Sequence, residues 1–269
     1  MENESANLSP ITSYPMGRHI YFLTGVKYLY QTLFCIHSLT KVSNIKFKFI
    51  LVDDGSLNKK LIEYIHLQLP GVEVIQHYVI EQNLHQYLPL NKFPYLHHKR
   101  KVYPHIKKLT DIHTIPGNPW KLVLDSDMLF WKEPKEIIDW LNNPDRPLHM
   151  VDCDESYGYT TALMENLCNS KIKILINVGA IGLNSDQINW ESIEHWIQVL
   201  EEKEGTSYYL EQALSAMLIG CSNSVVLNSK DYIVNPNNEM ISNKSGTLHH
   251  YVDMSKEGYF KLAWKNCIQ

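Results

Sequence analysis

Short apolar runs alternate with segments of helical periodicity through the first 127 residues, and this alternation is the strongest constraint on the fold. A short apolar run closed by a turn signal predicts a buried strand, while apolar residues spaced three and four apart predict a helix. Strands that alternate with helices are typical of a doubly wound, mostly parallel sheet. The expected strands are residues 19–25, 47–56, 71–78 and 120–127, and the expected helices are 28–42, 58–70 and 99–113.

Three of these expected strands end in polar or flexible residues. The endings are Thr24–Gly25, Asp53–Asp54 and Asp125–Ser126–Asp127. In a doubly wound sheet, the carboxyl ends of the parallel strands meet at one edge, and ligands bind there. We therefore expect these residues to converge on a single site.

The second half of the chain is less regular, but it contains no internal repeat and no low-complexity linker. We expect one domain over residues 17–269, preceded by a flexible polar tail over residues 1–16. Residues 81–98 contain two prolines and are expected to be irregular, either as a lid or as a simple connection. The other expected elements are helices at 134–141, 190–203 and 208–218, strands at 147–152, 222–228 and 246–252, and a strand pair or bent strand at 172–184.

Composition excludes several classes of partner. The formal net charge of -4 gives no reason to expect binding to nucleic acid or to an anionic membrane. No apolar run approaches the roughly 20 residues of a membrane span, and the first residues lack a signal-peptide pattern. The five cysteines are scattered without a Cys-x-x-Cys pair. We therefore expect a soluble protein of the reducing cytoplasm with free thiols.

Asp125 and Asp127 stand two residues apart at the end of a buried strand. Residues i and i+2 of an extended segment point to the same side, so the two carboxylates are expected to face the same spot. A divalent cation relieves their repulsion, and oxygen ligands favour Mg²⁺ or Mn²⁺. A helix cap followed by a solvated turn residue is the plain structural alternative.

Four motifs follow one another along the chain, and together they carry a family resemblance. They are YFLTGVKYLYQTLFCIHSL, LVLDSDMLF, LINVGAIGLN followed by YLEQALSAML, and LHHYVDMSKEGYF. In this order they resemble the metal-dependent glycosyltransferases of the GT-A fold, and within them glycosyltransferase family 8, over about residues 18–265. The resemblance implies a single α/β domain with a doubly wound, mixed but mostly parallel sheet flanked by helices. Residues 17–130 would bind the nucleotide and residues 131–269 the acceptor.

The resemblance also assigns residues to the nucleoside end of a nucleoside-diphosphate sugar donor. Thr24, Gly25 and Tyr28 in the first motif would line the site of the nucleotide base. Asp53 and Asp54 would contact the base or the ribose, with a turn-forming pair as the alternative.

In the second motif, the resemblance implies that Asp125 and Asp127 hold Mn²⁺ or Mg²⁺ on the donor diphosphate. Ser126, between them, belongs to the same donor site. The family also places a basic residue about 17 residues upstream. Lys108 stands at that distance from Asp125, and its neighbour Lys107 is the alternative.

The fourth motif resembles a C-terminal family element with a histidine and a lysine six residues apart. His250 and Lys256 have this separation, which implies a metal ligand and a diphosphate contact. Neighbouring residues on an extended segment face opposite ways, so His249 or His250 reaches the metal, and His250 is the expected ligand. A carboxylate pair with a neutral imidazole also suits Zn²⁺.

In the third motif, the resemblance places Asn177 and Gly179 beside the donor sugar and the acceptor. It places Glu211 and Gln212 as an acid and an amide near the reacting carbon. A second Asp-x-Asp pair, Asp152 and Asp154, is expected to contact the acceptor or to belong to a plain loop.

These observations predict a metal-dependent glycosyltransferase, hexosyltransferase-like, that uses a nucleoside-diphosphate sugar, with a UDP-sugar favoured. The acceptor is a saccharide, a peptide or a small molecule. The resemblance implies retention of anomeric configuration, although a general base at Glu211 would give inversion. Two alternatives stay open: a haloacid-dehalogenase-like phosphatase with Asp125 as nucleophile, and a non-catalytic nucleotide-sugar-binding module.

Overall fold

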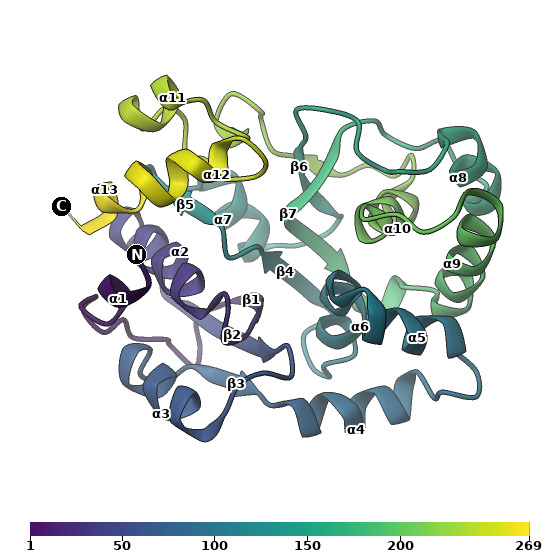
Figure 1. Cartoon of the computed structure of the whole chain (residues 1–269), viewed down its shortest axis with the longest axis horizontal. Coiled ribbons are helices and arrows are strands. Elements are labelled where there is room, and N and C mark those ends of the chain that lie inside the picture. Colours follow the sequence, from purple (N-terminus) through teal and green to yellow (C-terminus); the bar gives the residue numbers. More distant parts are fainter. Residues whose placement is uncertain (269) are drawn as a thin grey trace.

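A mixed seven-stranded sheet forms the centre of the computed structural model, which describes residues 1–268 (Figure 1). Its strand order is β3-β2-β1-β4-β7-β6-β8. The first four strands in this order run parallel, β7 runs antiparallel to both β4 and β6, and β8 is parallel to β6. The strands are β1 (Arg18–Thr24), β2 (Phe47–Asp53), β3 (Glu73–Ile75), β4 (Trp120–Leu124), β6 (Leu148–Val151), β7 (Ile176–Asn184) and β8 (Val225–Val226).

A smaller sheet of order β5-β10-β9 continues from the carboxyl end of β4. It consists of β5 (Met128–Phe130), β9 (Tyr232–Val234) and β10 (Leu248–His250). The longer helices are α2 (Leu29–Val42), α3 (Lys59–Gln68), α4 (His77–Tyr87), α5 (Pro94–Val102), α6 (Lys107–His113), α7 (Lys135–Asn142), α8 (Thr161–Cys168), α9 (Trp190–Glu204) and α10 (Leu210–Ile219). The short helices are α1 (Glu2–Ser5), η1 (Pro104–Ile106), η2 (Ser185–Gln187), α11 (Asn238–Asn243), α12 (Ser255–Gly258), η3 (Tyr259–Ala263) and α13 (Lys265–Ile268).

Both faces of the large sheet are buried, as the near-continuous apolar runs in its strands predict. In β1, Ile20 and Phe22 enter one hydrophobic core and Tyr21 enters the other, because successive side chains of a strand alternate between faces. The first core includes residues of α2 and α7, and the second includes residues of α4, α6, α9 and α10. The predicted doubly wound α/β fold is therefore confirmed.

Most of residues 81–98 are helical, in α4 and α5, which are joined by a turn at residues 88–93, so the expectation of an irregular segment is wrong. Ile80 and Leu84 are fully buried at an i, i+4 spacing on α4. Pro94 occupies the first turn of α5, where its fixed φ favours a helix start and its missing N–H costs nothing. Arg100 of α5 then donates to both carboxylate oxygens of the buried Asp111 on α6, at 2.7 and 3.0 Å. These helices form a packed connection over one face of the sheet.

Two further elements are shorter than predicted. The helix expected at 99–113 is divided at Tyr103, whose φ of -138° and ψ of 82° are not helical, because Pro104 disfavours helical geometry in the residue before it. The expected strand at 71–78 shrinks to β3, since His77 already begins α4. In the segment 172–184, only β7 is a strand, and Leu175 before it has a φ of +63°.

Residues 1–16 make defined contacts where a flexible tail is expected. The backbone N–H of Ile11 donates to Gln68 O at 2.9 Å, and that of Ser13 donates to Pro70 O at 2.8 Å. Leu8 joins the first hydrophobic core. At the other end, α13 packs against α2, as α1 does (Figure 1).

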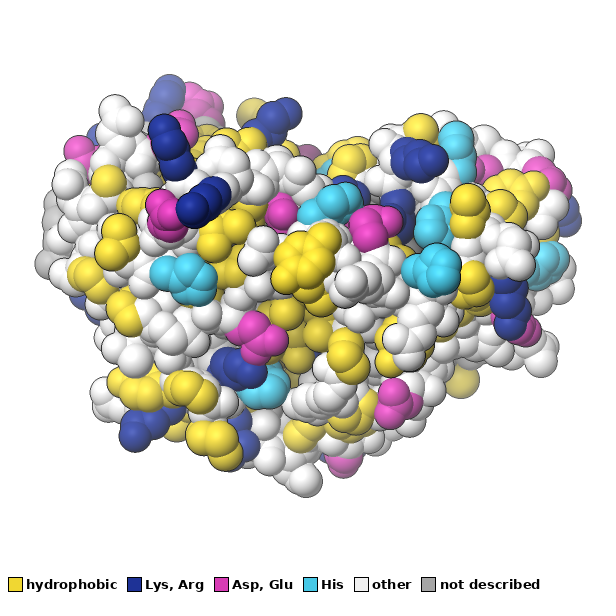
Figure 2. All heavy atoms as spheres, turned by 90° about the horizontal axis from the view of Figure 1, so that it is seen from below, with side chains coloured by type: hydrophobic (Ala, Val, Ile, Leu, Met, Phe, Trp, Pro, Cys, Tyr) yellow, Lys and Arg dark blue, Asp and Glu magenta, His cyan; other side chains and the backbone are white. Residues whose placement is uncertain are grey.

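The outer surface carries charges of both signs. On the face seen in Figure 2, acidic and basic side chains are interspersed among apolar and uncharged ones, in line with the small formal net charge of -4. Within residues 1–268, none of the helices combines the length and apolar character needed to cross a membrane. The five cysteines are free thiols.

Candidate active site at the carboxyl edge of the sheet

The three polar strand endings meet at one edge of the sheet, because β2, β1 and β4 are adjacent and parallel. The chain leaves β4 at Leu124 and turns into β5 at Met128, and the turn carries both aspartates. The N–H of Asp125 donates to Gly179 O on β7 at 2.7 Å. The carbonyl of Asp127 accepts from the N–H of Tyr251, just after β10, at 2.9 Å. Two neighbouring strands therefore hold this turn in place.

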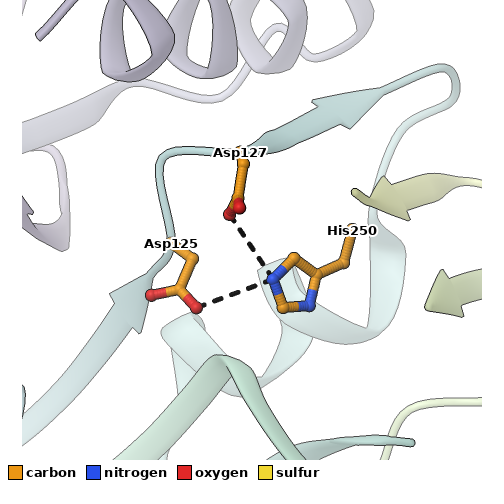
Figure 3. A group of neighbouring side chains, drawn as sticks. All are labelled: Asp125, Asp127 and His250. Atoms are coloured by element: carbon orange, nitrogen blue, oxygen red, sulfur yellow. Dashed lines mark ion pairs between the residues drawn. The ribbon is translucent and has the colours of Figure 1, made fainter. Parts of the chain in front are cut away.

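Asp125, Asp127 and His250 form the one group of metal-ligating side chains found among residues 1–268 (Figure 3). His250 Nε2 lies 3.6 Å from Asp125 Oδ2 and 3.5 Å from Asp127 Oδ1. One ligand atom from each residue lies within 4.8 Å of the other two. Two carboxylates and one imidazole fit a divalent cation, with open positions for diphosphate oxygens or water. The three side chains therefore form a candidate site for a divalent cation.

Charges of both signs surround this cluster and shift the pKa values of its members. Burial alone would lower the pKa of His250, but attraction to Asp127 and Asp125 raises it above its ordinary value. Burial would raise the pKa of Asp127, but His250 and then Lys256 hold it below its ordinary value. Lys256 Nζ lies 3.8 Å from Asp127 Oδ2.

The ring of His249 does not face the aspartates, whereas the ring of His250 does. His249 Nε2 lies 2.6 Å from Ser245 O, and its Nδ1 lies 3.1 Å from the hydroxyl of Tyr251. Burial lowers its pKa to about 4, so this ring is neutral and packs within the small sheet. The alternation of side chains along β10 thus directs His250 alone toward the aspartates.

Lys108 on α6 connects the aspartate turn to α10. Its Nζ lies 2.8 Å from Asp125 Oδ1 and 3.5 Å from Glu211 Oε2, and it donates to Val178 O at 3.1 Å. Burial raises the pKa of Glu211 to about 7, against the opposing effect of Lys108. Lys107 lies elsewhere and donates to Asp54 O at 2.6 Å. Lys108, rather than Lys107, is therefore the cation beside the aspartates.

A chain of hydroxyls joins the first strand to the aspartate turn. Thr24 Oγ1 lies 2.8 Å from Thr32 Oγ1, which lies 2.8 Å from Ser126 Oγ. Thr24 is 1 % exposed, so the structure places it behind the site rather than at its surface. Thr32 is a residue that the sequence analysis missed, because a threonine inside an amphipathic helix carries no distinguishing signal.

The residues expected at the nucleotide base differ in their freedom to bind. Asp53 is buried, and its Oδ1 accepts from the N–H groups of Gly55 and Leu57 at 2.8 and 3.0 Å, which is the turn-forming role left open above. Asp54 lies against Gly25, where a Cβ would be 2.0 Å from its Oδ1.

Tyr28, at the start of α2, is 50 % exposed. Asp54 Oδ1 accepts from the N–H of Ser56 at 3.0 Å and from its hydroxyl, so Tyr28 is better placed than either aspartate to meet a ligand at this edge of the sheet.

Asn177 and Gly179 lie beside His250, because β7 starts at this edge of the sheet. Asn177 Oδ1 lies 3.0 Å from His250 Nδ1 and accepts from the N–H of Gly179 at 2.9 Å. Asn177 Nδ2 and Gln212 Nε2 both donate to Asp152 Oδ2, at 3.1 and 3.0 Å. Asp152 thus belongs to the site, whereas Asp154 is exposed.

No protein-family model matches the chain, and no curated protein matches it. The chain is similar in structure to mouse xyloside xylosyltransferase 1, with a TM-score of 0.56 and 12 % identity, over 89 % of this chain and 97 % of that one. It is similar to the galactosyltransferase LgtC in complex with donor and acceptor sugar analogues, with a TM-score of 0.56 and 12 % identity, over 92 % and 95 %.

A third similar structure is the glycosyltransferase GlyE of Streptococcus pneumoniae TIGR4. Its TM-score is 0.52 and its identity 14 %, over 94 % of this chain and 62 % of that one. These neighbours have the GT-A glycosyltransferase fold, and the chain shares that fold, as the four motifs predict. At such low identities the similarity establishes the architecture alone.

Proposed function

We propose that this protein is a metal-dependent glycosyltransferase that transfers a sugar from a nucleoside-diphosphate sugar to an acceptor, with a UDP-sugar as the favoured donor. The main support is the convergence of Asp125, Asp127 and His250 at the carboxyl edge of a GT-A sheet. One structural neighbour, LgtC, was solved with donor and acceptor sugar analogues. The acceptor is proposed to be a saccharide, a peptide or a small molecule. The free thiols support placing the protein in the reducing cytoplasm.

The residues around the cluster would together bind the donor and stabilise the departing diphosphate. A bound Mn²⁺ or Mg²⁺ supplies positive charge that offsets the charge developing on the leaving diphosphate. Asp125, Asp127 and His250 would hold that cation. Lys256, half exposed beside Asp127, would bring a second positive charge to the same diphosphate. Lys108 neutralises Asp125 from the protein side.

The contacts of Glu211 favour retention of configuration. An inverting mechanism needs a carboxylate that can take the proton of the acceptor hydroxyl. Glu211 is 4 % exposed, its Oε2 is paired with Lys108, and its Oε1 accepts from Ser215 Oγ at 3.4 Å. Both of its oxygens thus have partners inside the protein. We propose that Glu211 and Gln212 line the reacting centre without acting as a general base.

The phosphatase alternative finds no support in the geometry. A nucleophilic aspartate must be free to attack phosphorus, but Asp125 Oδ1 is paired with Lys108 and its Oδ2 faces His250. The fold neighbours are glycosyltransferases as well.

The proposed function is tested by sugar release and transfer from a panel of UDP- and GDP-sugars with Mn²⁺. We expect turnover with one donor class, its abolition by chelator, and its loss in an Asp125→Ala/Asp127→Ala variant. Asp145→Ala is the control, because Asp145 lies on the surface next to Arg146. Full activity of the double variant would refute the metal role. Metal-dependent donor binding without turnover, over a broad acceptor screen, would instead identify a non-catalytic binding module.

A further inference from the structure

Asp152 lies just after β6, outside the metal cluster, yet its contacts lead to both the cluster and the reacting centre. Its Oδ2 accepts from Asn177 Nδ2 at 3.1 Å and from Gln212 Nε2 at 3.0 Å. Its Oδ1 accepts from the N–H of Cys153 at 2.8 Å. One carboxylate therefore receives two side-chain amides, one from β7 and one from α10.

The hydrogen-bond donors and acceptors among these groups allow one orientation of the Asn177 amide and one tautomer of His250. An ionised carboxylate only accepts hydrogen bonds, so Asn177 must turn its NH₂ group toward Asp152. The N–H of Gly179, which can only donate, requires independently that Oδ1 of Asn177 lies on its other side, at 2.9 Å. His250 Nδ1 lies 3.0 Å from that oxygen and must therefore carry the hydrogen. The lone pair of the neutral ring is then on Nε2, the atom that faces Asp125 and Asp127.

The backbone is distorted where it brings these groups together. The pairing of β6 with β7 shifts register between His149 and Met150, and the shift sets Met150 opposite Asn177. Leu175 then adopts a φ of +63°, and its carbonyl accepts from the N–H of Asp152 at 2.7 Å. A positive φ is unfavourable for a leucine, so the surrounding structure must compensate for it.

We propose that Asp152 is a positioning residue that sets the tautomer of His250 through Asn177 and at the same time orients the carboxamide of Gln212. The same carboxylate oxygen holds the NH₂ group of Gln212, so Oε1 is the end of this amide that can meet a substrate hydroxyl. Outer partners of this kind orient a ligating histidine and tune metal affinity. The inference rests on the proposed metal site, but its first readout needs neither metal nor transfer.

The first test uses Asp152→Asn, which keeps the shape and removes the charge. Whichever way the new amide turns, its NH₂ group meets a donor, either the N–H of Cys153 or the two side-chain amides. Ring-nitrogen NMR of His250 in the metal-free protein, at a pH where the ring is neutral, should show Nδ1–H in the wild type and a mixture of tautomers in the variant. The Mn²⁺ affinity measured by calorimetry should fall about 10–100-fold.

A compensating pair separates positioning from a general effect of charge. Asn177→Asp alone sets two carboxylates against each other and should also weaken Mn²⁺ binding. In the Asp152→Asn/Asn177→Asp double variant, the amide and the carboxylate exchange places, so the His250 tautomer and the Mn²⁺ affinity should recover to within about threefold of wild type. Gln212 then faces an NH₂ group, so turnover should stay low. Asp154→Asn, on an exposed carboxylate two residues away, should change neither quantity.

Three outcomes would overturn the inference. They are an unchanged His250 tautomer and Mn²⁺ affinity within twofold in Asp152→Asn, a double variant no better than the single variants, and an Asp154→Asn variant that loses as much affinity as Asp152→Asn. If Asp152→Asn does not fold, the comparison of Asn177→Asp with the double variant tests the same point. Loss of the tautomer with no sugar transfer by the wild type would refute the proposed function and leave the inference standing.

Discussion

Replacing Gly179 by alanine should strongly weaken metal binding while leaving the fold largely intact. A Cβ on Gly179 would lie 2.4 Å from both Cε1 and Nδ1 of His250. Non-bonded carbon atoms are in contact at about 3.5–4.0 Å, so the imidazole would have to move by roughly 1 Å. A protein ligand stays within about 0.2 Å of its ideal metal distance, so a displacement of this size takes Nε2 out of coordination.

The size of the effect follows from two separate costs. Overpacking one methyl group in a closely packed region lowers the free energy of unfolding by about 1–3 kcal/mol. Disturbing an outer partner of a ligand typically lowers metal affinity about 10–100-fold, and moving the ligand itself should cost at least that much. Gly182→Ala is a matched control on the same strand, because its Cβ would lie 2.5 Å from Cζ2 of Trp140, away from the metal cluster.

Calorimetric titration with Mn²⁺ and urea unfolding of the three proteins measure these two quantities independently. We expect both variants to lose similar stability and only Gly179→Ala to lose metal affinity. The reasoning fails if Gly179→Ala binds Mn²⁺ within twofold of wild type, or if Gly182→Ala loses as much affinity.

Three further perturbations test other parts of the structure. Mn²⁺ at one hundred times its dissociation constant should stabilise the fold by about 2.7 kcal/mol, which is measured as an increase in the unfolding temperature. A chelator should reverse this increase, and the Asp125→Asn/Asp127→Asn variant should not show it. Burial lowers the pKa of His113 to about 3, below the ordinary value near 6.5, so its contribution to stability is complete above pH 6.5 and is lost as the pH falls toward 3. In urea unfolding between pH 6.5 and 4, the free energy of unfolding should therefore fall less steeply with decreasing pH in His113→Asn than in the wild type, by up to about 1.4 kcal/mol per pH unit. An unchanged slope would contradict the assignment. Arg100→Met should cost about 3–5 kcal/mol because it strands the buried Asp111, and Arg100→Met/Asp111→Leu should recover most of that loss; equal stability of the two variants would show that the pair is not coupled.

The strands and the aspartate turn could be predicted because their signals are local. The apolar run of β4 ends at Leu124, and the polar Asp125–Ser126–Asp127 follows directly, so both the element and its ligand edge can be inferred from the order of residues. His250 was predicted because its separation from Lys256 matches a known family element. The structure adds the reason why His249 does not face the aspartates, since its ring is engaged with Ser245 and Tyr251.

Other features depend on contacts between distant segments and left no readable pattern. Apolar periodicity is the same for parallel and antiparallel strands, so the antiparallel direction of β7 could not be inferred from it. Prolines at 89 and 94 indicate a break in helical structure, although Pro94 in fact starts α5. The role of Asp152 depends on meeting Asn177 and Gln212, which lie 25 and 60 residues away.

The pairing of β5 with β10 determines the stage of folding at which this site can form. His250 lies opposite Met128 in that ladder, so the third proposed ligand comes from a segment far along the chain from the two aspartates. Contacts of such long range form late, since a large loop must close before they contribute. A cation bound there would act as a cross-link between the two segments, in the way a disulfide restricts an unfolded chain. Fraying of the C-terminal ladder would therefore open the site before the large sheet is disturbed, so metal affinity reports on completion of the fold.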